Sequence, residues 1–345
     1  MIDALVVGGG QAGLAAAHAL GRAGLTPVVL EAREEAVGSW PSYYDSLVLF
    51  SPARFSSLPG IPFPGDPDRY PHRDEVIDYL RRYASGLDAD IRTGQRVTAV
   101  RREEAHFRVE AGGDVLTARL VIAASGAFGT PHRPVLPGVD GFTGTVLHSA
   151  DYREPGPFAG QRVVVVGAAN TAVQVAHELA SVARVTLATR APIRFGPRRL
   201  LGRDVHFWSR SLGFDHLPVG HLLARPPRAP VLDDGRYRRA VRAGRPDQRR
   251  MFTSLDADAV VWPDGTRERV DTVVLATGYR PELSYLDPAE RGQVRGISTV
   301  HNGLGFVGLE WQRSFASATL RGVGRDARFV VDRLLRLGAV VTSRG

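Results

Sequence analysis

Short uncharged apolar runs, separated by glycine-rich turns and amphipathic segments, recur along the chain. The first run is Leu5-Val6-Val7; an alanine-rich stretch follows as far as Ala23, and a second apolar run ends at Glu31. An apolar run without charges is typical of a strand buried on both faces, and alanine is the strongest helix former. The pattern predicts a strand–helix–strand unit over residues 5–31.

The same pattern returns in the middle of the chain. A buried strand is predicted at 162–166, a helix with apolar residues at 173, 175, 176 and 179 follows, and a further strand ends at Thr189-Arg190. Between the two units, the periodicity predicts a helix from His72 and strands at 96–100, 106–109 and 116–124. Later segments predict a hairpin turning at 263–265, strands at 271–278 and 304–309, and a helix over 314–337.

These elements predict an α/β fold with two dinucleotide-binding domains of the Rossmann-like, three-layer type. We expect residues 1–155 plus 281–345 to form one dinucleotide-binding domain and residues 156–280 to form a second one inserted in it. The strands ending at Gly126 and Gly278 close the two halves similarly, which indicates a weak internal repeat.

The first glycine turn has the chemistry of a dinucleotide site. Gly8, Gly10 and Gly13 have the G-x-G-x-x-G spacing between strand and helix. They allow a tight turn, close approach to a pyrophosphate and close helix packing, while the helix start at Gln11-Ala12 offers N–H groups to phosphate. Glu31, followed by Ala32, would accept hydrogen bonds from a ribose diol. The alternative is a glycine-rich turn in an ordinary α/β sheet.

The second turn is a variant, with Gly167, Ala169 and Ala172 at the three positions. The methyl group of Ala169 lies where a pyrophosphate should approach, so it weakens or redirects binding. Its second strand ends at Thr189-Arg190 instead of an acid, which favours NADPH, with NADH as the alternative cofactor. The other interpretation of Arg190 is a surface residue of an arginine-rich chain.

Composition narrows the function classes. The 345 residues contain no cysteine, which excludes disulfides, thiolate metal sites and redox-active dithiols, and we predict no metal site. The net charge is +8 and every basic residue other than histidine is arginine; nine arginines lie between Arg225 and Arg250. No nucleic-acid module surrounds them, so we expect a solvated or cofactor-facing segment. Without a membrane span or signal peptide, the expected location is the cytoplasm, with no membrane partner.

One stretch resembles a family fingerprint. Phe142, Gly144, His148 and Tyr152 fit F-x-G-x-x-x-H-x-x-x-(Y/F/W) just before the second glycine turn. Together with the segments 38–40, 70–71, 276–281 and 315–327, this resembles the flavin-containing monooxygenases, especially their short bacterial members. The resemblance covers nearly the whole chain and is weakest over 195–250.

The resemblance implies that the first turn binds FAD and the second binds NADPH, so that residues 1–155 plus 281–345 would be the FAD-binding domain and residues 156–280 the NADPH-binding domain. Reduced flavin would react with O₂ to form a hydroperoxide that oxygenates a small sulfide, amine or ketone. His148 would hold the two domains together, and its alternative role is acid–base catalysis. Further cofactor contacts are implied at Gly38, Trp40, Gly126, Thr171, Gly278 and Trp311, although Trp40 could instead be a core residue.

Two residues are assigned to the reacting centre by the resemblance. Asn170, at the start of the second helix, would hydrogen-bond NADPH near the flavin; its alternative role is a helix N-cap. Many family members carry an asparagine beside the flavin in the segment matching 49–52, where this chain has Ser51. Either Ser51 or backbone replaces it, or the enzyme releases hydrogen peroxide.

Other functions stay open at this point. One is an FAD-dependent NAD(P)H oxidase or reductase that passes hydride to a quinone or another acceptor. Another is a flavin-bound sensor without turnover, which Ala169 favours. The partners expected for the monooxygenase are a small-molecule substrate and O₂, nucleic acid is not expected, and a homodimer stays open.

Overall fold

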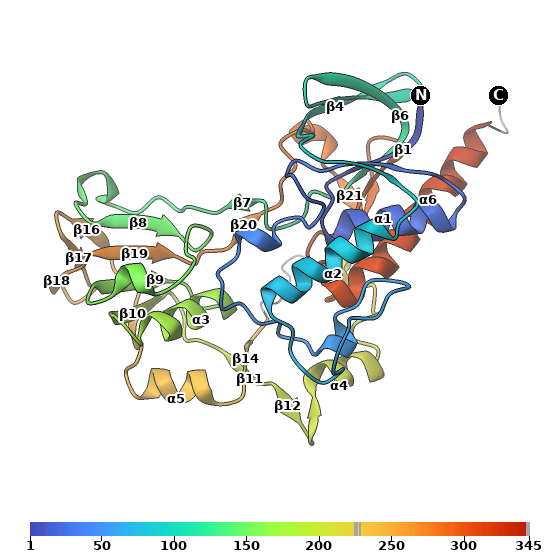
Figure 1. Cartoon of the computed structure of the whole chain (residues 1–345). Helices are drawn as coiled ribbons and strands as arrows, with labels where there is room; N and C mark the ends of the chain where they lie inside the picture. The colour runs from blue at the N-terminus through green and yellow to red at the C-terminus, as the bar shows by residue number, and fades with distance from the viewer. Residues whose placement is uncertain (224–226, 228, 343–345) are drawn as a thin grey trace.

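The computed structural model describes residues 1–223, 227 and 229–342. Figure 1 shows two lobes, with both chain termini on the same lobe. The first lobe is built on a nine-stranded sheet whose main order is β21-β22-β23-β6-β1-β2-β3, with β4 and β5 continuing from β6. Its strands are β1 (Ile2–Val7), β2 (Val28–Leu30), β3 (Asp90–Arg92), β4 (Val97–Glu103), β5 (His106–Ala111), β6 (Asp114–Ala123), β21 (Gln293–Val294), β22 (Ile297–Ser298) and β23 (Leu304–Phe306).

The first sheet is the middle of three layers. Three helices pack on one face: α1 (Gln11–Arg22), α2 (Arg73–Ser85) and α6 (Leu320–Thr342). Residues of β4 and β5 pack against the other face together with Tyr285 and Leu286. Val6 faces the helices and Val7 faces the opposite layer. This two-sided burial explains why the strand is apolar throughout.

The second lobe contains a five-stranded parallel sheet in the order β15-β10-β9-β19-β8. Its strands are β8 (Thr145–His148), β9 (Arg162–Val166), β10 (Arg184–Thr189), β15 (Asp247–Arg250) and β19 (Thr272–Leu275). Helix α3 (Asn170–Leu179) packs on one face, over Val163 and Val165. On the other face, Leu255 of β16 (Ser254–Asp256) and Val260 of β17 (Ala259–Val261) contribute to the core, and β18 (Arg267–Arg269) pairs antiparallel with β17. The chain therefore forms two three-layer α/β units, the second inserted within the first.

Two short strands join the lobes. β7 (Thr130–Pro131) leaves the first lobe, β20 (Tyr279–Arg280) returns to it, and the two pair antiparallel. β8 lies within the expected first domain of residues 1–155, yet it pairs with β19 in the second sheet. Leu136 also packs in the core of the second lobe. We propose a revised boundary before Leu136, because β8 is inseparable from the second sheet.

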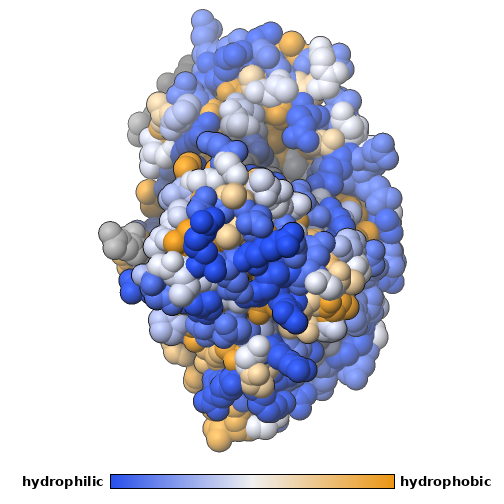
Figure 2. All heavy atoms as spheres, turned by 90° about the vertical axis from the view of Figure 1, so that its left-hand side faces the viewer, coloured by the Kyte–Doolittle hydropathy of each residue, from blue (hydrophilic) through white to orange (hydrophobic). Residues whose placement is uncertain are grey.

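Residues between β10 and β15 form an excursion from the second lobe. It contains β11 (Phe195–Pro197) paired with β14 (Val231–Asp233), β12 (Arg199–Leu200) paired with β13 (Arg203–Asp204), and the helices α4 (Val205–Ser211) and α5 (Arg236–Arg242). Of the arginine cluster expected here, Arg225 and Arg228 lie outside the described residues. The face seen in Figure 2 is largely hydrophilic. Among the described residues, no helix has the length and apolar composition to cross a membrane.

The C-terminal elements correct two sequence-based boundaries. The helix expected from Ser314 begins at Leu320. The hydroxyl of Ser317 accepts hydrogen bonds from the backbone N–H groups of Arg313 and Ser314, which holds the preceding residues in turns. Such side-chain bonds compete with the helical pattern. The strand expected over 304–309 ends at Phe306, and Gly308 follows with φ +90°.

Candidate functional site: two glycine turns

The first glycine turn is closed by contacts that exclude any larger residue. Gly8 has φ +105°, and a Cβ there would lie 2.7 Å from the carbonyl oxygen of Ala124 on the neighbouring strand. A Cβ on Gly13 would lie 1.7 Å from the oxygen of Gly8. Gly10 precedes α1 and provides no capping side chain. The turn therefore presents bare backbone at a helix N-terminus, which suits a pyrophosphate.

Glu31 is brought to this turn as the sequence predicts. Its side chain is buried, and its two carboxylate oxygens accept hydrogen bonds from the N–H groups of Gly9 at 2.6 Å and Arg33 at 2.9 Å. Each oxygen retains a further lone pair, as ribose hydroxyls would require. Gly38 also reaches the turn, because a Cβ on Gly10 would lie 3.2 Å from the Gly38 Cα. These residues form a cradle that fits the pyrophosphate and ribose of a dinucleotide.

A chain of hydrogen bonds connects the turn to two other segments. The Trp40 Nε1–H donates to Gln11 Oε1 at 3.2 Å, and Gln11 Nε2 donates to the carbonyl of Ala318 at 2.7 Å. A Cβ on Gly308 would lie 2.5 Å from the Ala12 Cβ. Gly308 and Ala318 therefore both lie against the start of α1, while the Trp311 ring between them packs on Phe315. Sequence reasoning selected Trp40 and Gln11 separately but did not find their bond.

The second turn repeats the close approach of the first. Gly167 has φ +146°, and a Cβ there would lie 2.5 Å from the carbonyl oxygen of Ala276. Ala169 is exposed and has the extended backbone of a helix N-cap, so its methyl group is accommodated. The alternative that Asn170 is the cap is wrong, because Asn170 is the first residue of α3. Its Oδ1 is buried and has no hydrogen-bond partner among the described residues, so it is available to accept a hydrogen bond from a ligand. Thr171 follows it in the helix.

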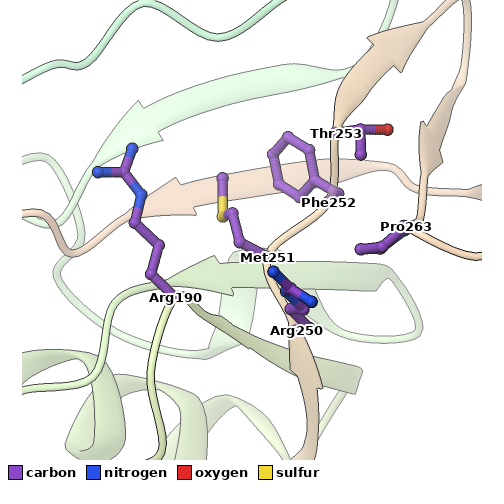
Figure 3. Close-up of a pocket in the computed structure, with 6 residues that line it drawn as sticks. All are labelled: Arg190, Arg250, Met251, Phe252, Thr253 and Pro263. Atoms are coloured by element: carbon purple, nitrogen blue, oxygen red, sulfur yellow. The ribbon is translucent and has the colours of Figure 1, made fainter.

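Two arginines end neighbouring parallel strands of the second sheet. Arg190 directly follows β10, and Arg250 is the last residue of β15, in register with Thr189. Both side chains are exposed and line a cavity of about 390 Å³. Figure 3 shows these arginines with the other lining residues, Met251, Phe252, Thr253 and Pro263. Sequence reasoning missed Arg250, and its only signal was the arginine cluster before an apolar pair.

Thr189 is oriented differently from its neighbour. Its side chain is buried, and its hydroxyl accepts a hydrogen bond from Gln248 Nε2 at 3.2 Å. The Thr189 hydroxyl is therefore already engaged within the sheet, which leaves it less available for the expected cofactor contact. Ser51 is similarly engaged, with its Oγ 2.9 Å from Ser56 Oγ. No hydrogen bond joins Ser51 to Asn170 within the described part of the chain.

His148, at the end of β8, contacts the segment at β20 where the chain returns to the first lobe. Its Nδ1 accepts from the N–H of Ala150 at 3.1 Å, so Nε2 carries the proton toward the carbonyl of Gly278 at 3.1 Å. Its ring contacts Tyr279 edge to face. Burial lowers the pKa of His148, which favours the neutral form. Gly126 and Gly278 both have positive φ, and a Cβ on either would meet open space.

Comparison with known proteins identifies what this arrangement resembles. Residues 5–198 match the family described as pyridine nucleotide-disulphide oxidoreductase. The structure aligns with a flavin-containing monooxygenase from Stenotrophomonas maltophilia with a TM-score of 0.82 and 32% identity, over 99% of both chains. Indole-3-pyruvate monooxygenase YUCCA1 from rice is 31% identical over 94% of this chain and 89% of its own length. An uncharacterized CzcO-like oxidoreductase from Geobacillus kaustophilus is 30% identical over 97% and 99%, respectively.

Proposed function

Because the chain belongs to the pyridine nucleotide-disulphide oxidoreductase family and, within it, to the flavin-containing monooxygenases, we propose that it is an NADPH-dependent FAD monooxygenase. The observation that carries this proposal is the pair of closed glycine turns, one on each lobe, in a chain without cysteine. Two such turns support two bound dinucleotides. The missing thiols exclude a cysteine-based dithiol exchange as the second half-reaction.

The first turn would hold FAD, the cofactor that accepts hydride and activates O₂. Gly8, Gly10 and Gly13 would admit its pyrophosphate, and Glu31 would accept hydrogen bonds from its ribose. Trp40 and Gln11 would fix the covering segment over the turn, which supports exclusion of water from the reacting centre.

The second turn would hold NADPH. Arg190 and Arg250 support this assignment because two guanidinium groups at one cavity suit a dianionic ribose phosphate. NADH, which lacks that phosphate, would bind more weakly. The unpaired Oδ1 of Asn170 would accept a hydrogen bond from the nicotinamide carboxamide and orient that ring for hydride transfer.

The substrate is proposed to be a small sulfide, amine or ketone that reacts together with O₂. Ser51 would donate a hydrogen bond at the oxygen-reacting centre, although its bond to Ser56 must be shared or broken for this. His148 is assigned a structural role, because both of its ring nitrogens are already hydrogen-bonded. A cytoplasmic location and a homodimer remain predictions.

The test measures NADPH consumption, oxygenated product and hydrogen peroxide together. The FAD-loaded protein is given NADPH and a panel of sulfides, amines and ketones. We expect at least one compound to yield product in proportion to the NADPH consumed. Hydrogen peroxide equal to the NADPH consumed, without product from any compound, would instead identify an oxidase. Rapid reduction of a quinone would identify a reductase, and the absence of NADPH consumption would favour the sensor.

A further inference from the structure

A spur projects from the excursion of the second lobe. We define it as the β12–β13 hairpin together with α4, residues 199–211. Figure 1 shows the hairpin at the lower edge of the molecule, standing away from both sheets. Leu200 and Leu201 form its tip and are 50% and 82% exposed, respectively. In Figure 2 hydrophobic residues also lie at the lowest point of the molecule.

The backbone conformation at the tip shows that the exposed Leu201 does not stabilise the fold. Leu201 has φ +49°, in the left-handed region that disfavours side chains other than those of Gly, Asn and Asp. A leucine exposed at such a turn has an unfavourable backbone conformation, and its side chain is not stabilised by burial. Its side chain is therefore better explained by something that covers it.

The apolar surface continues from the tip along α4. The Trp208 Nε1–H donates to the carbonyl of Leu200 at 2.8 Å, so the helix and tip are in contact. Phe207 packs edge to face on Trp208 with ring centroids 5.2 Å apart. Just past the helix, Leu212 and Phe214 are 64% and 57% exposed. Leu200, Phe207 and Trp208 thus share one local surface, and exposed apolar residues continue along the chain to Phe214.

The charges around this surface are of one sign. Arg199, Arg203 and Arg210 lie within the spur, where Asp204 is the only acid. The guanidinium of Arg203 lies 4.6 Å from the Phe207 ring centroid, while Arg199 and Arg210 are exposed. The spur therefore presents a positive charge to solvent, provided that the carboxylate of Asp204 points inward.

Asp204 is directed inward and anchors the spur. Its carboxylate accepts hydrogen bonds from the Tyr70 hydroxyl and from the His206 ring at 2.7 Å, and its side chain is only 9% exposed. Tyr70 belongs to the first lobe, so this contact fixes the base of the spur across the two lobes. The acid is therefore internal, and arginine is the charged residue presented to solvent.

We propose that the spur is a peripheral docking surface for an anionic lipid bilayer. Leu200 and Leu201 would enter the interface, Trp208 would lie at the headgroup level, and the arginines would contact anionic headgroups. A second copy of the chain is a poorer occupant, because an isologous contact would bring like-charged spurs together. Nucleic acid is also a poorer occupant, because the leucine tip offers no planar group for base stacking and the rings of Phe207 and Trp208 pack on each other.

Vesicle sedimentation tests the proposal with the full-length, FAD-loaded protein. Vesicles of phosphatidylcholine alone are compared with vesicles that also contain phosphatidylglycerol. We expect the wild type to sediment with the anionic vesicles and to be released by added salt. Leu201→Gly removes the apolar side chain and suits the positive φ, so it should keep the fold while lowering vesicle partitioning about tenfold.

Val135→Ser is the matched control, because Val135 is 92% exposed outside the spur. It should partition as the wild type does. The proposal is overturned if the wild type does not sediment with anionic vesicles, or if Leu201→Gly sediments equally well. It is also overturned if Leu201→Gly converts a wild-type dimer to a monomer without changing vesicle binding, since the occupant would then be a second copy. NADPH oxidation in detergent-free buffer should be unchanged by Leu201→Gly, which keeps this test separate from the enzymatic one.

Discussion

The carboxylate of Glu31 accepts a hydrogen bond from the backbone N–H of Gly9 at 2.6 Å, joining the end of β2 to the first glycine turn. We expect Glu31→Gln to keep the shape of the turn but lower FAD affinity about tenfold, since the charged acceptor for ribose is lost. FAD binding measured by flavin fluorescence checks this. Glu34→Gln, an exposed neighbour, is the control and should bind FAD normally. Equal losses in both variants would contradict the assignment.

Substitutions at Gly8 and Gly126 distinguish the cost of a positive φ from the cost of a steric clash. Both have positive φ, but a Cβ on Gly126 meets open space whereas one on Gly8 meets the Ala124 oxygen at 2.7 Å. Gly126→Ala should lower the free energy of unfolding by about 1–2 kcal/mol. Gly8→Ala should lower it by about 3 kcal/mol or more and abolish FAD binding. Denaturant unfolding of both variants measures the two losses in free energy of unfolding. Equal losses would show that the close contact between Gly8 and Ala124 adds no cost beyond that of the positive φ.

Much of this first turn could be predicted from sequence because its constraints are local. The apolar run at residues 5–7, the glycine spacing and Glu31 lie within one strand–helix–strand unit, and parallel pairing brings the ends of the two strands together. The buried strand β9 was predictable for the same reason. Its successive valines face alternate sides of one sheet, as covered parallel strands require.

Other features depend on contacts between distant segments. Arg250 lines the same cavity as Arg190 only because β15 returns after the excursion to pair with β10, and no periodicity in the intervening residues indicates that pairing. β8 has only four residues, too few to show which sheet it joins. The cap at Ala169 was missed because its extended backbone, and not its side chain, defines the helix start.

Arg190 and Arg250 should both contribute to cofactor choice. Arg190→Ala and Arg250→Ala are each expected to raise the KM for NADPH about tenfold or more, because each removes a charge-assisted hydrogen bond to phosphate. The KM for NADH should change less than about twofold. Arg242→Ala, an exposed arginine on α5, is the control. Equal effects on NADPH and NADH would rule out a ribose-phosphate role for either arginine.

His148 should make stability depend on pH. Its pKa in the folded chain is lowered from 6.5 by burial, the largest cause. As pH falls through 6.5, the unfolded chain takes up a proton that the folded chain does not, so stability decreases until the folded pKa is reached. We expect wild type to lose more stability between pH 7.5 and pH 5.5 than His148→Gln, by urea unfolding. Because His18 and His177 have lowered pKa values too, the difference between the two proteins is the quantity to compare. An identical pH dependence would contradict a buried neutral His148.

Asn170 should show opposite effects on stability and on cofactor reduction. Its Oδ1 is buried without a partner, which costs free energy in the cofactor-free protein. Asn170→Ala removes that unpaired oxygen, so the unfolding temperature without NADPH should stay equal or rise. The KM for NADPH should increase several-fold, about 1 kcal/mol of lost binding, and flavin reduction at saturating NADPH should slow. Asn302→Ala, at an exposed position outside both turns, is the control. A fall in unfolding temperature with unchanged reduction kinetics would show that Asn170 supports the helix and does not bind the nicotinamide cofactor.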